Sequence, residues 1–420
     1  MASWRIRGGL PLYGQLRVQG SKNSVLPILS AALLARDPVV LENCPDLQDV
    51  DAALAILRHL GCRAEREKDV IRVDPRVLSQ NSIPRELMGE MRSSVIFLGA
   101  LLARLGEGHL TLPGGCDIGP RPIDMHLKAM EAMGASIRQQ DAVLQCHARA
   151  LHGAHIRLPY PSVGATENTM IAASLAKGDT LLENAAREPE IRDLAAFLEA
   201  LGCHIEGAGT AVLHIRGMED RENLREGEVT HRVIPDRIAA GTFLCAAAAT
   251  GGSITLEGVQ PETLHPVLFL LHQAGCDVMR RPDRLFLHGR PIRPIALETQ
   301  PYPGFPTDLQ APMMAAMLRT PGESLFRESV FPKRFRHGPA LRELGAQICL
   351  MPGGAVVRGV SRLHGASMEA TDLRGGAAMV IGALCAEGES EITGLRHLAR
   401  GYEDLPGQLR LLGADITVHP

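Results

Sequence analysis

Apolar positions along the chain form segments that recur at a nearly fixed spacing. Six times an apolar stretch ends in Leu, Met or Ala, then Gly, then Ala or Cys, and two residues later an apolar residue opens a strand-like pattern. Such regularity is typical of a duplicated structural unit. The glycines of this phrase are Gly61, Gly134, Gly202, Gly275, Gly345 and Gly413, separated by 73, 68, 73, 70 and 68 residues.

Within each unit the pattern predicts two helices of different kinds. One is apolar nearly all round and is therefore expected to be buried. A β-type stretch follows it, as at 109–112 and 253–256, and then an amphipathic helix that ends in the glycine phrase and a closing strand or hairpin. We predict an α/β fold of six repeated units, in which inner helices are wrapped by sheet and outer helices. The inner helices end at 31–35, 100–103, 173–176, 245–249, 315–318 and 383–386.

Length and composition narrow the class of protein. A chain of 420 residues is too long for one core and suits two domains of three units each. No apolar run reaches the roughly 18 residues of a membrane span. The segment 1–7 lacks the apolar stretch of a signal peptide. We therefore expect a cytoplasmic protein with no membrane partner.

Charge and cysteine usage exclude further classes. A net charge of −3 and 3% aromatic residues provide neither a basic face nor stacking platforms, so we expect no nucleic-acid partner. The nine cysteines show neither CxxC pairs nor metal-ligand spacing, which predicts reduced thiols and no metal. Motifs for nucleotide hydrolysis, hydride transfer and metal-assisted hydrolysis are missing. A small-molecule partner is the expectation.

Polar residues gather where the six inner helices should begin. A Ser, Thr or Asp at any one start is readily explained as a helix N-cap. Six starts together favour an anion site, because a helix N-terminus carries partial positive charge and free N–H groups. Lys22, Arg92 and Arg374 lie in these first turns, where cations oppose the helix dipole, so an anion is expected between them. The starts are 21–23, 91–94, 164–168, 235–237, 307–309 and 371–374.

A loop rich in Gly and Pro, 112–122, holds the cysteine with the strongest claim to reactivity. Cys116 lies five residues before Arg121, which can lower a thiol pKa, so a nucleophile or proton donor is predicted there. Cys44 has a similar place in its unit and ranks second. Three cysteines occupy the repeat position that alanine holds in other units, and they are interpreted as small buried residues of the core: Cys62, Cys203 and Cys276.

Arginines recur in the corresponding loops of other units. Guanidinium groups bind carboxylate and phosphate bidentately, which suits a substrate that carries both. Arg192 and Arg336 are interpreted as surface charges, and Asp308 as either a helix cap or a general base. The remaining loop arginines are Arg121, Arg187, Arg334 and Arg400.

Eight short motifs in this sequence together resemble those of the enolpyruvyl transferases, and the resemblance runs from about residue 5 to the end. The resemblance implies a two-domain inside-out α/β barrel, with one domain at 22–229 and the other formed by 1–21 and 230–420, and an active site in a cleft that closes on substrate. It also implies a monomer that uses no metal or organic cofactor. The motifs that carry it are at 20–27, 112–124, 162–168, 183–191, 233–238, 304–310, 370–374 and 400–403.

The implied reaction moves the enolpyruvyl group of phosphoenolpyruvate to the 3-hydroxyl of UDP-N-acetylglucosamine. Phosphate leaves through a tetrahedral ketal, in the first committed step of peptidoglycan synthesis. The resemblance makes Asp308 the base for the hydroxyl proton and Cys116 the proton donor and the target of fosfomycin. Asp372 is a second carboxylate able to face a cationic carbon.

The resemblance also assigns binding residues. Lys22, Arg121 and Arg400 are expected to hold phosphoenolpyruvate, with Arg334 and Arg374 near its carboxylate. Expected contacts to the sugar nucleotide, besides Asp308, are Asn23, Arg92, Arg121, Pro122, Ile123, Asp124, Met125, Ser162, Val163, Gly164 and Val330.

Two departures and three alternatives accompany this interpretation. Asp117 beside the loop cysteine is expected to raise its pKa, and Pro120 to stiffen the loop, so alkylation should be slower. The alternatives are the sister activity on shikimate 3-phosphate, a noncatalytic copy of the enzyme, and an RNA-end-processing protein on the same repeated unit.

Overall fold

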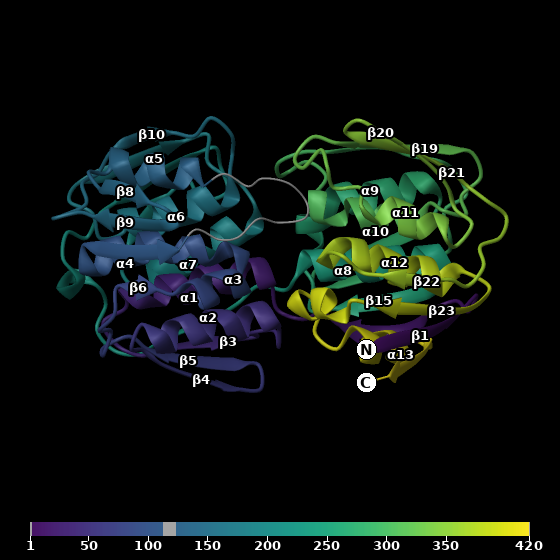
Figure 1. Ribbon diagram of the computed structural model, residues 1–420, viewed down its shortest axis with the longest axis horizontal. Coiled ribbons are helices and arrows are strands. Elements are labelled where there is room, and N and C mark those ends of the chain that lie inside the picture. The colour runs from purple at the N-terminus through teal and green to yellow at the C-terminus, as the bar shows by residue number, and fades with distance from the viewer. Residues whose placement is uncertain (1, 112–122, 420) are drawn as a thin grey trace. The chain divides into compact units, whose positions relative to one another are not determined.

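The computed structural model describes residues 2–111 and 123–419. Cys116, Arg121 and Pro122 lie outside the described residues. Contacts divide the described residues into two compact units: one contains the segment up to Gln19 and everything from Pro235 onward, and the other contains the described residues from Gly20 to Ile234. Within the described residues the chain passes between the units at 19/20 and at 234/235 (Figure 1).

The Gly20–Ile234 unit contains three inner helices packed on one another, each with an outer helix. Its inner helices are α1 (Lys22–Ala31), α4 (Phe97–Leu105) and α6 (Val163–Ala173), and its outer helices are α2 (Gln48–His59), α5 (Asp124–Ala132) and α7 (Pro189–Ala200). A short α3 (Arg85–Glu90) and the 3₁₀ segments η1 (Ala32–Leu34), η2 (Arg92–Ile96) and η3 (Arg221–Asn223) complete the helical elements.

Three four-stranded sheets cover these helices. Their strand orders are β14-β3-β5-β4, β6-β7-β9-β8 and β10-β11-β13-β12. The strands are β3 (Val39–Glu42), β4 (Arg63–Glu67), β5 (Val70–Asp74), β6 (Ser82–Ile83), β7 (Glu107–Thr111), β8 (Ser136–Gln140), β9 (Val143–His147), β10 (His155–Arg157), β11 (Asp179–Glu183), β12 (His204–Glu206), β13 (Val212–Arg216) and β14 (Val229–Arg232).

The other unit repeats the plan with the rest of the chain. Its inner helices are α8 (Arg237–Thr250), α10 (Gln310–Ala316) and α12 (Leu373–Cys385), and its outer helices are α9 (His265–Ala274), α11 (His337–Arg342) and α13 (Leu405–Leu411). Its 3₁₀ segments are η4 (Pro261–Leu264), η5 (Thr307–Leu309) and η6 (Leu395–Arg400).

Its three sheets have the orders β16-β17-β15-β2, β18-β19-β21-β20 and β22-β23-β1-β24. The strands are β1 (Ser3–Gly8), β2 (Tyr13–Arg17), β15 (Ser253–Glu257), β16 (Asp277–Arg281), β17 (Arg284–His288), β18 (Ala296–Thr299), β19 (Glu323–Glu328), β20 (Gln347–Met351), β21 (Gly354–Arg358), β22 (Ser367–Glu369), β23 (Gly388–Thr393) and β24 (Asp415–His419).

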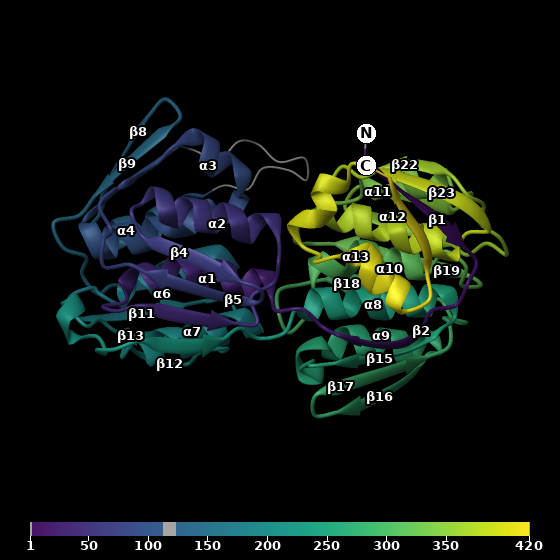
Figure 2. The same cartoon turned by 90° about the horizontal axis from the view of Figure 1, so that it is seen from below.

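All six sheets have one pairing rule. The edge strand runs parallel to its neighbour, as β14 does to β3, and the other two pairings are antiparallel. In the sixth unit the chain ends after β24, and β1 occupies the place that a hairpin strand fills elsewhere, with Trp4 opposite Ile392 and Val418. The two termini accordingly lie close together in both views (Figures 1 and 2).

Each unit has its own hydrophobic core, built around its inner helices. Helix α8 is buried continuously from Arg237 to Ala249, as its all-round apolar sequence predicts. The six sheets are separate and do not join into one closed barrel within the described residues. The predicted α/β architecture of repeated units, with helices inside and sheet outside, is confirmed. None of the helices in this part of the chain has the length and apolar character that crossing a lipid bilayer requires.

The repeated glycine is explained by backbone geometry. The glycines of all six copies of the repeated phrase have φ between 89° and 108°, a conformation in which a residue with a side chain is strained. Each follows its outer helix, and in five of the six units the next residue bonds back to a helix carbonyl, as the Cys62 N–H does to Leu57 O and the Cys276 N–H to Leu271 O. That next residue is buried, with Cys62 4% exposed, which explains why only Ala or Cys occupies it.

Candidate active site

Asp308 is held between two arginines. It lies in η5, directly before α10, with Oδ1 2.8 Å from Arg334 Nη1 and Oδ2 3.0 Å from Arg374 Nη2. The arginine side chains are 7% and 3% exposed, against 24% for Asp308. Neither η5 nor α10 receives a side-chain cap bond. Of the two predicted readings of Asp308, the helix cap is therefore wrong.

The arginines decide the protonation state of Asp308. Burial alone would raise the pKa of this carboxyl group, but the charges and hydrogen bonds of Arg374 and Arg334 hold its pKa well below the usual range. Asp308 is therefore ionised at neutral pH. It is also a weak base for as long as both arginines stay in place.

Arg374 is fixed by the start of α12 and by an aromatic ring. Asp372 caps this helix, and its Oδ1 accepts the N–H groups of Arg374 at 3.0 Å and Gly375 at 2.8 Å. The guanidinium lies 5.4 Å from the centre of the Tyr402 ring. Burial by itself opposes the charge, but Tyr402, Asp308 and Asp236 together raise the pKa of Arg374. The cation is permanent, and Asp372 serves as its helix cap.

Arg334 is held in place by a hydrogen-bond network that includes Glu328. Its Nη1 donates to Thr307 Oγ1 at 3.0 Å, and that hydroxyl donates to Glu328 Oε2 at 2.9 Å. Glu328 Oε1 accepts the backbone N–H groups of Val330 and Phe331, both at 2.9 Å. Glu328 thus ties the Val330 turn to the segment that carries Asp308. Our sequence reasoning missed Glu328, the last residue of β19.

Two nitrogens of these arginines have no hydrogen-bond acceptor in the described part of the chain. Arg334 Nε and Arg374 Nη1 are buried and without a hydrogen-bond partner among the described residues. Buried donors are nearly always paired, and an unpaired one is destabilising by about 1–3 kcal/mol. Such donors beside two fixed positive charges are suited to an anionic ligand.

In the Gly20–Ile234 unit, Lys22 is paired with an aspartate. Its Nζ lies 2.7 Å from Asp49 Oδ2, and the side chains are 13% and 4% exposed. Lys22 opens α1, and Asp49 lies in the first turn of α2, where a negative charge complements the helix dipole. The charge of Lys22 opposes the dipole of its own helix α1, and it is therefore balanced by Asp49 on the neighbouring helix α2. Asn23 follows on α1 and is half-buried.

Asn168 joins three predicted segments in this unit. Its Oδ1 accepts the Gly99 N–H at 2.7 Å, and its Nδ2 donates to Val95 O and to His126 Nδ1, both at 3.1 Å. Burial lowers the pKa of His126 to about 4, so the ring is neutral. A Cβ at Gly164 would lie 3.1 Å from the His126 ring.

This network determines which predicted residues lie together. It packs α5, which begins at Asp124 after Ile123 and contains Met125, against α6, which contains Val163 and Gly164, with the His126 ring next to Gly164. Ser162 caps α6, and its Oγ accepts the Ala165 N–H at 3.4 Å. The network also fixes the helix that follows Arg92, whose own side chain lies outside what the structure describes. We missed His126, which the sequence signals only as a histidine inside an amphipathic helix.

The remaining predicted arginines and cysteines are distinguished by exposure. Arg187, Arg192 and Arg336 are exposed, as predicted for the last two. Cys44 is 1% exposed, and burial raises the pKa of its thiol to about 12, so its second rank as a reactive thiol is wrong. Among the eight described cysteines only Cys349 is exposed.

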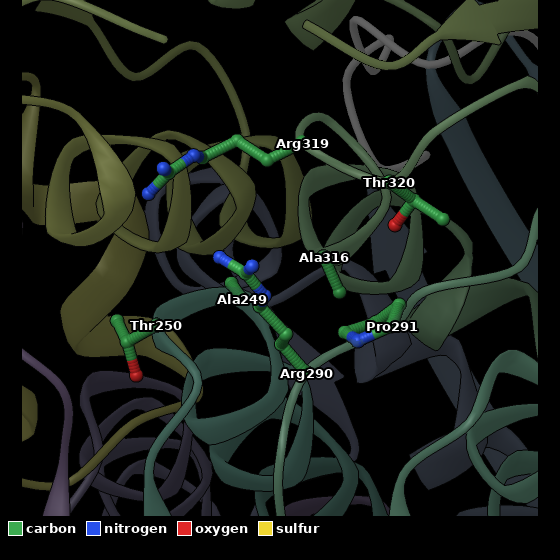
Figure 3. A pocket seen from close by; sticks show the side chains of 7 residues that line it. All are labelled: Ala249, Thr250, Arg290, Pro291, Ala316, Arg319 and Thr320. Carbon is green, nitrogen blue, oxygen red and sulfur yellow. The ribbon is translucent and has the colours of Figure 1, made fainter. Parts of the chain in front are cut away.

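A small hollow lined by residues of the other unit's inner helices lies away from Asp308. Figure 3 shows Arg290 and Arg319 beside Thr250, near the C-terminal ends of the inner helices α8 and α10. Arg319 Nη1 approaches Cys385 O, at the end of α12, at 3.5 Å. Asp308 lies at the opposite end of α10, and we interpret Arg319 as a partner for C-terminal carbonyls.

The fold and this arrangement define the class of protein. The chain belongs to the family described as EPSP synthase (3-phosphoshikimate 1-carboxyvinyltransferase), which matches residues 6–409. It is 45% identical over 417 residues to UDP-N-acetylglucosamine 1-carboxyvinyltransferase 1 of Carboxydothermus hydrogenoformans, covering 99% of this chain and 98% of that protein. It is 44% identical over 413 residues to UDP-N-acetylglucosamine 1-carboxyvinyltransferase of Desulfovibrio desulfuricans, covering 98% of each.

Solved structures agree with this family. The enolpyruvyl transferase NikO from Streptomyces tendae matches with a TM-score of 0.90 at 28% identity, covering 100% of both chains. EPSP synthase from Acinetobacter baumannii matches with a TM-score of 0.74 at 18% identity, also over 100% of both chains, which shows the shared fold alone. The predicted resemblance to enolpyruvyl transferases is confirmed.

Proposed function

We propose that this protein transfers the enolpyruvyl group of phosphoenolpyruvate to the 3-hydroxyl of UDP-N-acetylglucosamine and releases phosphate. Relatives with this name match it at 41–45% identity over nearly the whole chain. The observation that carries the chemistry is Asp308 between two buried arginines with unpaired N–H groups. In cells that carry it out, this reaction starts peptidoglycan synthesis.

The donor explains why so many cations are needed. Phosphoenolpyruvate has a carboxylate and a phosphate on three carbons, and guanidinium groups bind both with paired hydrogen bonds. We assign the carboxylate to Arg334 and Arg374, and the phosphate to Lys22, Arg121 and Arg400. The acceptor is assigned to Asn23, Arg92, Val330, the segment 121–125 and the turn 162–164.

Addition and elimination each move two protons. In addition, the 3-hydroxyl oxygen bonds to C2 of the donor, Asp308 takes the hydroxyl proton, and the Cys116 thiol gives a proton to C3. In elimination, the bond from C2 to the phosphate oxygen breaks, C3 returns its proton to the thiolate, and protonated Asp308 gives the former hydroxyl proton to the leaving phosphate. Positive charge that develops at C2 is stabilised by the Asp308 and Asp372 carboxylates.

Asp308 becomes an effective base when an arginine leaves it for the donor. Its low pKa comes from Arg374 and Arg334, and a donor carboxylate competes for the same N–H groups. Each ion pair exchanged in this way raises the pKa of Asp308 toward that of a working base. Donor binding thereby prepares the proton acceptor. We further propose a cytoplasmic monomer without metal or organic cofactor.

The test is phosphate release from phosphoenolpyruvate with each of two acceptors. Release with UDP-N-acetylglucosamine and none with shikimate 3-phosphate is expected. The reverse result would establish the sister activity, and release with neither would identify a noncatalytic copy. Cys116→Asp, which keeps a proton donor, should retain turnover and abolish labelling by fosfomycin.

A further inference from the structure

The turn that follows Arg400 is held by one buried side chain from the beginning of the chain. Gln19 Nε2 donates to Gly401 O at 3.3 Å, and Gln19 Oε1 accepts the Glu403 N–H at 3.0 Å. Gln19 is 6% exposed, and 382 residues separate it from Gly401. A single amide thus bridges the two sides of the turn.

Only one kind of side chain satisfies both bonds. The Gly401 carbonyl needs a donor and the Glu403 N–H needs an acceptor, and the planar amide of Gln19 supplies both within one group. The orientation of the amide is unambiguous, because reversing it would place donor against donor and acceptor against acceptor. Glutamate would lose the donor, and an isosteric methionine would lose both bonds.

The backbone of Gln19 is fixed as well. Its carbonyl accepts the Asp236 N–H at 2.9 Å, and the preceding Val18 N–H bonds to Glu257 O at 3.0 Å. Gln19 and Asp236 flank the two points where the chain passes from one unit to the other. The amide therefore projects from an anchored strand end onto the Arg400 turn.

Other contacts hold the residues that follow Arg400 in this turn. Gly401 lies so close to Leu373 that a Cβ would approach its side chain at 2.5 Å, and Tyr402 OH lies 2.9 Å from Thr242 Oγ1. These contacts fix the residues after Arg400 against α12 and α8. Arg400 itself is half-buried at the end of η6.

We propose that Gln19 is a positioning residue for Arg400, setting the angle at which this arginine meets the donor phosphate. The proposal rests on the proposed function, since it needs Arg400 to bind phosphoenolpyruvate. It predicts that removing the amide impairs use of the donor more than use of the sugar nucleotide. A residue that only stabilised the fold would affect neither in the folded enzyme.

The experiment compares Gln19→Met with Gln15→Met in full-length protein. Gln15 is exposed on β2, so its replacement controls for the new side chain. With two hydrogen bonds lost, KM for phosphoenolpyruvate is expected to rise roughly tenfold in Gln19→Met. KM for UDP-N-acetylglucosamine should change less than twofold, and Gln15→Met should match the wild type.

Each result has a defined meaning. A folded Gln19→Met with wild-type KM for the donor, or with equal rises for both substrates, overturns the proposal. If thermal unfolding shows that Gln19→Met does not fold, Gln19→Glu decides, because it keeps chain length and the acceptor for Glu403. A raised donor KM in that variant supports the proposal, and a wild-type KM or loss of folding in both variants refutes it. An inactive wild type would refute the proposed function instead.

Discussion

Arg374 Nη2 lies 3.0 Å from Asp308 Oδ2, although 66 residues separate them in the chain. Both belong to the first turns of neighbouring inner helices in one unit, since Arg374 is on α12 and Asp308 directly precedes α10. The two helix starts share the sequence Thr-Asp-Leu, in which Asp308 corresponds to Asp372 and Arg374 to Gln310, so the ion pair joins different positions of two copies of the repeat. The pair forms a preorganised site that is already charged before a ligand arrives.

Replacing Asp308 should abolish turnover without a general loss of folding. Asp308→Asn keeps the shape but cannot accept a proton, so kcat is expected to fall by roughly 10²- to 10⁴-fold. Phosphate release measures this loss. Asp179→Asn is the control, because Asp179 is an exposed aspartate paired with His214. Retention of more than a tenth of the wild-type rate by Asp308→Asn would exclude Asp308 as the base.

The pH dependence of the protein's unfolding should reveal the contribution of the ionised Asp308 carboxylate to stability. The folded pKa of Asp308 is depressed, so its contribution is present above the unfolded pKa of about 3.9 and is lost as pH falls through the lower folded value. Breaking a buried pair destabilises by about 3–5 kcal/mol. The gap in unfolding midpoint between wild type and Asp308→Asn should be constant above about pH 5 and shrink below about pH 4. A gap independent of pH down to about pH 2.5 would contradict this.

Lys22 and Asp49 should differ in the effects of their replacement. Lys22→Gln removes a donor contact and is expected to impair both turnover and phosphoenolpyruvate binding. Asp49→Asn leaves the cation but frees it from its 2.7 Å partner, so a smaller rise in donor KM is expected. Steady-state kinetics with Lys177→Gln, an exposed lysine, provide the control. Unchanged kinetics in Lys22→Gln would remove Lys22 from the site.

Buried and exposed cysteines should differ in the reactivity of their thiols. Burial raises the pKa of the Cys44 and Cys62 thiols to about 12, and it raises that of Cys245 as well. In native protein at pH 7.5, iodoacetamide is expected to label Cys116 and the exposed Cys349, as read by peptide mass spectrometry. Cys349→Ser should leave Cys116 as the fast site. Fast labelling of Cys44 in that variant would contradict the buried environment.

The repeated glycine can be tested where no neighbour interferes. Gly413 has φ +90°, and a Cβ there would meet nothing within 4 Å, so Gly413→Ala tests backbone strain alone. We expect about 1–2 kcal/mol of destabilisation, and less for Gly413→Asn, because asparagine tolerates this conformation better. Gly89→Ala, inside α3 with no contact, should instead be neutral or stabilising by up to about 1 kcal/mol. Urea unfolding midpoints rank the three variants.

Periodicity in the sequence predicted the repeat, the buried helices and the positions where they begin. It did so because an all-round apolar helix and a glycine with positive φ are local requirements that a sequence displays directly. It was less accurate at two helix starts, where 92–96 and 307–309 form 3₁₀ turns before the α-helix. Tight turns of that kind depend on packing and carry no periodic signal of their own.

The sequence by itself determined which residues carry charge at the helix starts, and it therefore identified Lys22, Asp308 and Arg374 as candidates. Only the tertiary structure decided their partners: Asp49 for Lys22, two arginines for Asp308, Glu328 behind Arg334 and Gln19 beneath the Arg400 turn. These partners are far apart in the chain and obey no spacing rule. Their contacts exist because six units pack around two cores, and the chemistry of Asp308 depends on that packing.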